Sequence, residues 1–406
     1  MKIAIYEPEP RICGPLTWAY HVKAGLLWLG HEVDVVSFTK SGKARVAWGT
    51  PKPGARWWLK PLDRVEKNVD AIKTLQEYDM VILPEIRNPS HDKEAIKNET
   101  VPLYVDALVK AGVPWTTSLH GTNYGEKETV FTDLLLSSPS RGKTLVTASW
   151  NSVESCEMFK AMDWVHTHLP YIPTHDIEVE IPRDPRTVGG LGRFIYNKGS
   201  HIVCSAGAFL PEDVTVEVWG AASIGLSANP TFIVYEEFVR KGEWEGSRPG
   251  PDGVAEGNII QPFNWTARLP GHALVKYLGN YDKPIETAAR LVAAAGLTAG
   301  NFSRGLVEFS TLEAMDAGTF TIVPKHLSDP LFEMFVLKDY ENALSFAKLR
   351  KDNSSVIEVA EMFKHCLDVW QDEAERKRIV QHNRQVLRTR NDPKIVAQTL
   401  IDSAFS

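Results

Sequence analysis

The chain has 406 residues, which is too long for one ordinary domain and suits two or three. Lys and Arg number 45 against 51 Asp and Glu, so the net charge of −6 excludes a protein held to nucleic acid by its overall charge. A local basic segment is still compatible with that balance. The four cysteines are scattered and form no C-x-x-C pair, which argues against a disulfide framework or a structural zinc site and indicates a reducing compartment. No run of about 18 uncharged apolar residues is present, so we expect no membrane span.

The first forty residues alternate between strand and helix. A strand is predicted at Lys2–Tyr6, a helix at Leu16–Leu29 that Gly30 ends, and a strand at His31–Phe38. Such a βαβ unit predicts a parallel sheet. The alternation continues with helices near Val65–Gln76 and Val101–Ala111 and with strands at Met80–Leu83, Pro114–Leu119 and Thr144–Ala148.

The prolines of Leu169–Pro173 interrupt this alternation and mark a crossover into a second alternating half. That half begins at Thr187–Arg193, and it has predicted strands at Thr215–Trp219, Ala273–Leu278 and Thr319–Val323 and a predicted helix at Leu306–Ala317. We therefore predict an α/β protein with two doubly wound, Rossmann-like domains and an interdomain cleft faced by the carboxyl ends of the strands. The predicted domains are residues 1–173 and 174–375, followed by a helical segment, 376–406, that packs back on the first domain.

Two glycine-containing loops follow predicted strands. Gly14 lies in the loop after the first strand, where a glycine lets the backbone approach a phosphate or a sugar, although a plain tight turn explains it equally well. In the second loop, Arg193 and Lys198 lie five positions apart between Gly192 and Gly199. Their side chains can converge on a diphosphate, which we favour over two solvated cations.

A third segment begins the helix predicted at Leu306–Ala317 and carries two acids, Glu308 and Glu313. A carboxylate at this place can accept hydrogen bonds from two ribose hydroxyls. Taken alone, the pair is better explained by carboxylates that complement the helix dipole.

Positive charge and tryptophan concentrate in Lys40–Lys67, which has eight cations and two acids, a net charge of +6. Cations interleaved with aromatic rings suit a polyanion with exposed bases, and solvated cations beside packed tryptophans are the alternative. The candidate acceptor or DNA contacts in this segment are Arg56, Trp57, Trp58 and Lys60. A second basic run, Arg376–Arg390, is better explained as a solvated helix face.

Taken together, the Gly14 loop, the crossover, the Gly-Arg-x4-Lys-Gly segment and the Leu-Glu-Ala-Met-Asp-Ala-Gly-Thr segment resemble the retaining nucleotide-sugar glycosyltransferases of GT-B fold. The resemblance runs from Met1 to about Pro324. Within that family it is nearest to the DNA α-glucosyltransferase type of T-even phages, which modifies 5-hydroxymethylcytosine. The Glu-x4-Glu spacing of Glu308 and Glu313 is similar to that type, whereas the commoner spacing in the family would place an acid at Gly305.

The resemblance implies a role for each matching residue. Arg193 and Lys198 would grip the donor diphosphate, Glu313 would bind the ribose, and Glu308 would lie near the sugar or phosphate. His120 falls where the family has a histidine beside the transferred sugar, and Gly121 stands where the phage type has an Asp. Glu308 and His120 are thus the candidate catalytic residues.

The function implied is transfer of a sugar from a UDP-sugar to a hydroxyl group, with retention of the anomeric configuration and without a metal or other cofactor. The favoured acceptor is a 5-hydroxymethylated pyrimidine in double-stranded phage DNA, and the location is then the cytoplasm of the host cell. Three alternatives stay open: a glycan, lipid or protein acceptor; a nucleotide-sugar epimerase of the same fold; and a non-catalytic sugar-nucleotide sensor. The sequence leaves the sugar, the nucleotide and the oligomeric state open.

Overall fold

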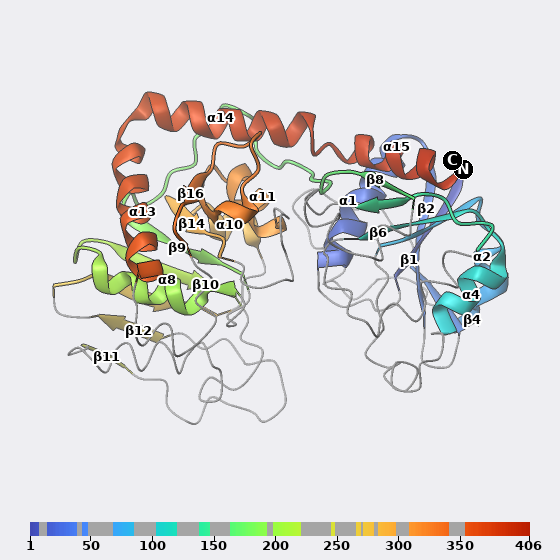
Figure 1. The fold of residues 1–406 in the computed structure, drawn as a ribbon, viewed down its shortest axis with the longest axis horizontal. Coiled ribbons are helices and arrows are strands. Elements are labelled where there is room, and N and C mark those ends of the chain that lie inside the picture. Colours follow the sequence, from blue (N-terminus) through green and yellow to red (C-terminus); the bar gives the residue numbers. More distant parts are fainter. Residues whose placement is uncertain are drawn as a thin grey trace. The chain divides into compact units, whose positions relative to one another are not determined.

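The structure of the protein is a computed structural model. It describes residues 1–7, 14–38, 43–47, 68–84, 103–119, 138–146, 163–192, 198–220, 245–247, 265–268, 271–279, 283–297, 308–340 and 354–406. These residues form two compact units, drawn in Figure 1. The described residues of unit 1 lie in Met1–Ile172 and Arg388–Ser406, and those of unit 2 lie in Pro173–Gly300 and Val307–Leu387.

Unit 1 is built on a sheet with the strand order β4-β3-β2-β1-β5-β6-β7-β8. Its strands are β1 (Lys2–Glu7), β2 (Glu32–Phe38), β3 (Lys43–Ala47), β4 (Asn68–Asp70), β5 (Met80–Leu83), β6 (Trp115–Leu119), β7 (Thr144–Val146) and β8 (Trp164–His166). The run from β2 to β8 is parallel, and β3 and β4 add an antiparallel pair at one edge. Residues Ile3–Tyr6 of β1 are fully buried, as expected of a central strand covered on both faces.

The helices of unit 1 are α1 (Gly14–Trp28), α2 (Ala71–Leu75), α4 (Leu103–Ala111) and α15 (Pro393–Ala404). After α1, Gly30 adopts a φ of 85°, and its N–H donates to the carbonyl of Leu27, so the predicted glycine stop is confirmed. The C-terminal α15 packs on α1 at Gly25, where a Cβ atom would lie only 2.1 Å from the carbonyl oxygen of Pro393. The absence of a side chain at Gly25 therefore permits this helix contact.

Unit 2 has the strand order β11-β12-β13-β10-β9-β14-β15-β16. Its strands are β9 (Thr187–Leu191), β10 (Thr215–Trp219), β11 (Glu245–Ser247), β12 (Trp265–Arg268), β13 (Leu274–Tyr277), β14 (Ala293–Ala295), β15 (Phe320–Pro324) and β16 (Phe335–Leu337). The run from β13 to β16 is parallel, and β11 and β12 extend it in antiparallel fashion. Numbered along the chain, the six parallel strands have the order 3-2-1-4-5-6, which is the Rossmann order.

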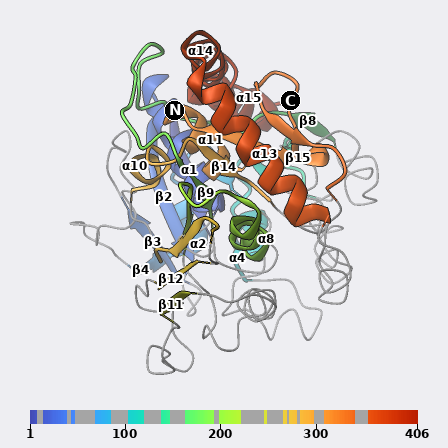
Figure 2. The ribbon, with the colours of Figure 1, turned by 90° about the vertical axis from the view of Figure 1, so that its left-hand side faces the viewer.

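The helices of unit 2 cover both faces of its sheet. They are α8 (Ser200–Ala206), α10 (Pro284–Ala288), α11 (Phe309–Asp316), α13 (Ser354–Gln371) and α14 (Glu373–Thr389), with short 3-10 turns at Gly207–Phe209 and Lys325–Leu327. Residues alternate between faces along β14: Ala293 and Ala295 pack in the cluster beneath α8 and α13, and Ala294 packs with residues of α10 and α11. Figure 2 shows α8 beside α13. The predicted doubly wound architecture is thus confirmed.

Three predictions from the sequence differ from the structure. Among the described residues of the helix expected near Val65–Gln76, Asn68–Asp70 instead pairs with β3 as a strand. Asp70 then caps α2 by accepting a hydrogen bond from the N–H of Lys73. The chain also enters unit 1 again at Arg388, later than residue 376.

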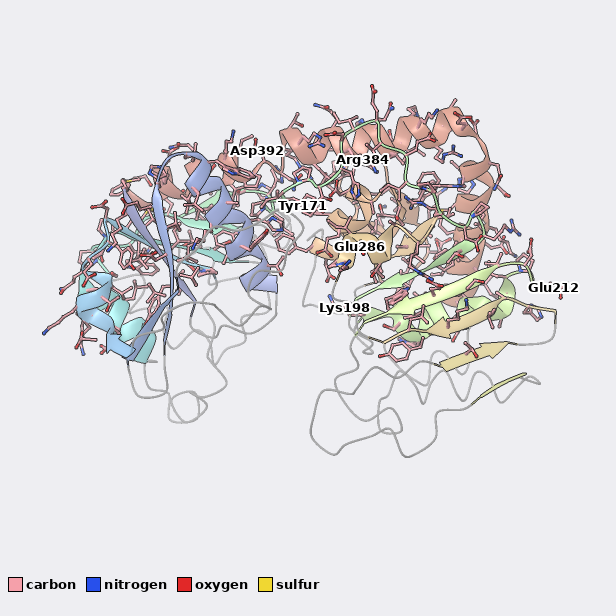
Figure 3. The ribbon with its side chains drawn as sticks, turned by 180° about the vertical axis from the view of Figure 1, so that it is seen from behind. Tyr171, Lys198, Glu212, Glu286, Arg384 and Asp392 are labelled. Carbon is pink, nitrogen blue, oxygen red and sulfur yellow. The ribbon has the colours of Figure 1, made fainter. Side chains whose placement is uncertain are left out.

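The reason for the later boundary is Arg384 on α14, labelled in Figure 3. This side chain is 1% exposed, so the solvated helix face predicted for the basic run is wrong at this residue. Its guanidinium group donates to the carbonyl oxygens of Asp176, Val179 and Asp316, all within unit 2. Among the described residues, no helix is both long and apolar enough to cross a membrane.

Candidate functional site

The candidate site lies where the sheet of unit 2 changes its winding direction. Strands β9 and β14 are neighbours, yet β9 leads into α8 on one face and β14 is followed by α11 on the other. The carboxyl ends of two such strands leave a crevice in which ligands of open α/β sheets bind. Lys198 precedes α8 and Glu308 precedes α11, so the topology places both residues at this point.

Gly199 lies at the switch point, the place where the neighbouring strands β9 and β14 lead to helices on opposite faces of the sheet. It caps α8 with a φ of 63°, a left-handed conformation that favours glycine. A Cβ atom here would lie 2.6 Å from Cβ of Leu297 and 2.9 Å from its carbonyl oxygen. Because Leu297 follows β14, this close approach holds the start of α8 against the end of β14.

The ammonium group of Lys198 forms an ion pair and hydrogen bond with the Glu308 carboxylate, although the two residues are 110 positions apart. Both side chains are partly exposed, at 21% and 24%. Glu308 is the N-cap residue of α11, yet its side chain makes no capping hydrogen bond. The carboxylate is therefore directed at Lys198 instead of its own helix, which favours a site over the plain helix-capping explanation.

Further along α11, Glu313 is partly buried and Asp316 is fully buried. Asp316 accepts hydrogen bonds from the N–H and hydroxyl of Thr174, at 2.8 and 2.6 Å, and from the N–H of His175. Burial acts to raise the pKa of Asp316, but the hydrogen bonds from His175 and Thr174 outweigh it and hold that pKa below its usual value. Asp316 thus fastens α11 to the segment that enters unit 2.

The structure brings Lys198 and Glu308 together, and it places Glu313 on α11, the helix that Glu308 caps. Gly14 is the first residue of α1 in unit 1. The other predicted site residues lie outside the described residues: His120, Arg193, Arg56, Trp57, Trp58 and Lys60. Their roles stay predictions.

Sequence reasoning missed the residues that hold α11 from its C-terminal end. Arg183 donates to the carbonyl oxygens of Ala317 and Leu291 and to the hydroxyl of Thr319. The bond to Ala317 satisfies a carbonyl group that the end of α11 leaves without an intrahelical partner. The only signal in the sequence is an arginine in a proline-containing segment, which says nothing of partners more than a hundred residues away. In the described ranges, no group of three or more His, Cys, Asp or Glu side chains is placed to hold a metal ion.

No protein-family model matches the chain, and no curated protein matches its sequence. Solved structures do match over nearly the whole length. Anabaena HepE in complex with UDP and glucose has 15% identity and a TM-score of 0.60, over 99% of this chain and 98% of that one. A glycosyltransferase from Rickettsia africae has 12% identity and a TM-score of 0.59, over 99% and 97%.

A third similar structure is an alpha-glucosyltransferase in complex with UDP and a 13-mer DNA containing an HMU base. It has 13% identity and a TM-score of 0.59, over 100% of both chains. At such low identity the likeness concerns the fold. The protein has the two-unit GT-B fold that these glycosyltransferases share, as the sequence predicted.

Proposed function

We propose that the protein is a glycosyltransferase that moves a sugar from a UDP-sugar to a hydroxyl group. The observation that carries this proposal is the Lys198–Glu308 pair at the switch point of a Rossmann-ordered sheet. The matching structures support it, since one is a complex with UDP and glucose and another is a complex with UDP.

In this proposal, the ammonium group of Lys198 neutralises the diphosphate as it leaves the sugar. The Glu308 carboxylate holds that ammonium in place before the donor binds, which lowers the entropy lost on binding. The acceptor hydroxyl attacks the anomeric carbon from the face that the diphosphate leaves, and the leaving phosphate takes the hydroxyl proton. The anomeric configuration is then retained, and Arg193 and His120 would complete the site as predicted.

Replacing Lys198 with Ala tests the donor site. Removal of a charge-assisted hydrogen bond worth roughly 1.5–3 kcal/mol should weaken UDP binding about tenfold or more in calorimetry. The matched control is Lys283→Ala, since Lys283 pairs with Glu286 at 2.8 Å but is 70% exposed in its side chain and lies before α10. Equal UDP affinity in the Lys198 variant and the parent would place the diphosphate elsewhere.

For the acceptor, we propose a 5-hydroxymethylated pyrimidine in DNA. The composition of the segment Lys40–Lys67 supports this, because it combines positive charge with tryptophan. The described part of the segment is β3, which belongs to the antiparallel pair at one edge of the unit 1 sheet. The intervening residues, 48–67, carry five cations and two acids and return the chain to β4 at that edge. The similar alpha-glucosyltransferase in complex with DNA gives further support.

Mass spectrometry of nucleosides from hydroxymethylated DNA, after incubation with a panel of nucleotide sugars, tests the acceptor. A glycosylated hydroxymethyl pyrimidine is the expected product. Release of UDP without a DNA product, in the presence of glycans, lipids or proteins, would assign another acceptor. Conversion of the sugar nucleotide with no acceptor would identify an epimerase, and binding without turnover would identify a sensor.

Neutralising Arg56 and Lys60 tests the interaction with the DNA backbone. Each cation that no longer neutralises a phosphate should flatten the log-log salt dependence of DNA binding by about 0.7–0.9. Replacing Trp57 or Trp58 with Ala should cost about 1–3 kcal/mol at an unchanged slope if bases stack there. Undetectable DNA binding by the parent protein at physiological salt would contradict the DNA proposal while leaving the donor proposal intact.

We also propose that the protein acts in a reducing cytoplasm. Cys204 and Cys366 are free and buried in the core of unit 2, and burial raises the pKa of both thiols. Such thiols stay protonated and unreactive. Unchanged unfolding free energy with and without a reducing agent is the expected result.

A further inference from the structure

Unit 2 has a cavity of about 300 Å³ at the end of α11 opposite to Glu308. Its walls come from the segment 177–183, from Gly318 after α11, from Trp370 at the end of α13, and from residues of α14. The volume lies at the lower limit for small-molecule pockets. The cavity is separate from the switch point, because α11 lies between Glu308 and Gly318.

The lining of this cavity is positively charged. Four cations line it, Arg183, Arg376, Lys377 and Arg384, against two acids, Glu178 and Glu180, so the net charge of the lining is +2. The other side chains of the lining are largely apolar, with Trp370 the largest. Charge of one sign in a walled cavity concentrates counter-ions.

Arg183 is a partly buried cation of this lining, and its hydrogen bonds go to neutral groups. It donates to three backbone carbonyls and to the hydroxyl of Thr319, and within the described part of the chain no carboxylate pairs with it. Burial lowers the pKa of Arg183 to about 9, and the charges of Arg384 and Arg376 add to the effect. An anion nearby would relieve this repulsion between like charges.

Trp370 gives the cavity a surface for the apolar part of a ligand. The guanidinium carbons of Arg183 and Arg376 lie 5.0 and 5.2 Å from the centre of its ring. The ring packs edge-on against Phe320 of β15, at 5.2 Å between centroids, so its position is fixed by the core. A flat, anionic molecule could contact this ring and the two cations at once.

The carboxylate of Glu180 already pairs with two of these cations, Arg376 and Lys377. Glu180 lies 3.3 Å from the ammonium of Lys377 and 3.9 Å from the guanidinium of Arg376. Its side chain is 58% exposed, and exposed ion pairs of this kind contribute little stability. A ligand oxyanion can therefore take its place at small cost.

We propose that this cavity binds a small ligand with one oxyanionic group, a phosphate or a carboxylate, and an aromatic or apolar body. The oxyanion replaces Glu180 at Arg376 and Lys377, and the body lies against Trp370. Arg183 and Arg384 supply the positive field from the inner wall. The site is independent of the proposed sugar transfer, because none of its residues belongs to the Lys198–Glu308 site.

Calorimetry with phenyl phosphate, benzoate and inorganic phosphate tests the proposal, with UDP added at saturation to fill any donor site. Phenyl phosphate or benzoate should bind with one-to-one stoichiometry, and the tighter of the two identifies the oxyanion. Arg376→Gln should weaken binding about fivefold or more, since a charge-assisted hydrogen bond is removed, and Glu180→Gln should tighten it about twofold or more, since a competing charge is removed. Inorganic phosphate should bind more weakly than phenyl phosphate.

The matched control is Arg378→Gln. Arg378 also lies on α14, but it pairs with Glu375 and Glu333 and does not line the cavity. Binding in this variant should equal that of the parent. The proposal is overturned if no probe binds saturably, if Arg378→Gln weakens binding as much as Arg376→Gln, or if UDP abolishes binding of every probe.

Discussion

Replacing Gly199 with Ala should separate two costs at the switch point of unit 2. The φ of 63° at this residue is strained for any residue with a Cβ atom, at about 1–2 kcal/mol. The new Cβ would also lie 2.6 Å from Cβ of Leu297 and 2.9 Å from its carbonyl oxygen. Relieving that overlap requires a backbone shift, with a cost of about 1–3 kcal/mol. The free energy of unfolding should therefore fall by about 2–5 kcal/mol.

Gly271, also in unit 2, provides the matched control. Its φ is 74°, but among the described atoms none lies within 4 Å of the position that a Cβ would take. Gly271→Ala should thus show the torsional strain alone, about 1–2 kcal/mol. Urea unfolding of both variants and the parent measures the difference, which isolates the collision with Leu297.

UDP binding provides a second measurement on the same variants. The collision pushes Gly199 away from Leu297 and so moves the adjacent Lys198, whereas Gly271→Ala leaves both residues in place. UDP affinity should fall in the Gly199 variant and not in the control. Equal loss of stability in the two variants would refute the argument that close approach to Leu297 requires glycine, and unchanged UDP affinity at Gly199→Ala would refute its link to the donor site.

Four further predictions concern other parts of the molecule. Burial lowers the pKa of His21 and of His201 to about 3. Each imidazole takes up a proton near pH 6.5 in the unfolded chain but stays neutral in the folded chain, so the free energy of unfolding should fall by about 1.4 kcal/mol per group for each pH unit below 6.5. Urea titrations at pH 7.5 and 5.5 should detect this fall. Glu313→Gln should weaken UDP binding and reduce the preference for ribose over deoxyribose donors; an unchanged preference would assign Glu313 to a structural role. Sugar transfer should persist in excess EDTA, and its complete loss, restored by a divalent cation, would contradict metal-free catalysis. Gly25→Ala should lower the free energy of unfolding by about 1–3 kcal/mol, because the added carbon meets the carbonyl oxygen of Pro393 at 2.1 Å, and equal urea midpoints would contradict this contact.

Local pattern in the sequence was sufficient for the alternating strands and helices. Met80–Leu83 and Thr215–Trp219 were predicted with the bounds that the structure has, because runs of apolar and β-branched residues fit a buried parallel strand wherever they lie in the sheet. The resemblance also predicted that Lys198 and Glu308 lie near the sugar donor.

Only the tertiary structure decided the conformation of Ala293–Ala295 and the burial of Arg384, because both run against the local preference of the sequence. Ala293–Ala295 forms the strand next to the switch point, although alanine favours helix, because β9 and β15 supply the hydrogen bonds on either side and α11 needs small residues to approach. Arg384 belongs to a charged run that reads as solvated, yet it is buried, because carbonyl groups of unit 2 accept its hydrogen bonds.

The pairing of Lys198 with Glu308 is the clearest case of information that the sequence did not contain. The predicted roles put both residues near the donor, but no local pattern links side chains 110 residues apart. The pairing follows from the adjacency of β9 and β14, since each residue lies in the connection that follows one of these strands. Strand order is a property of the whole sheet, whereas propensity and motif are properties of a few neighbouring residues. For that reason the contact between Lys198 and Glu308 became visible only in the folded chain.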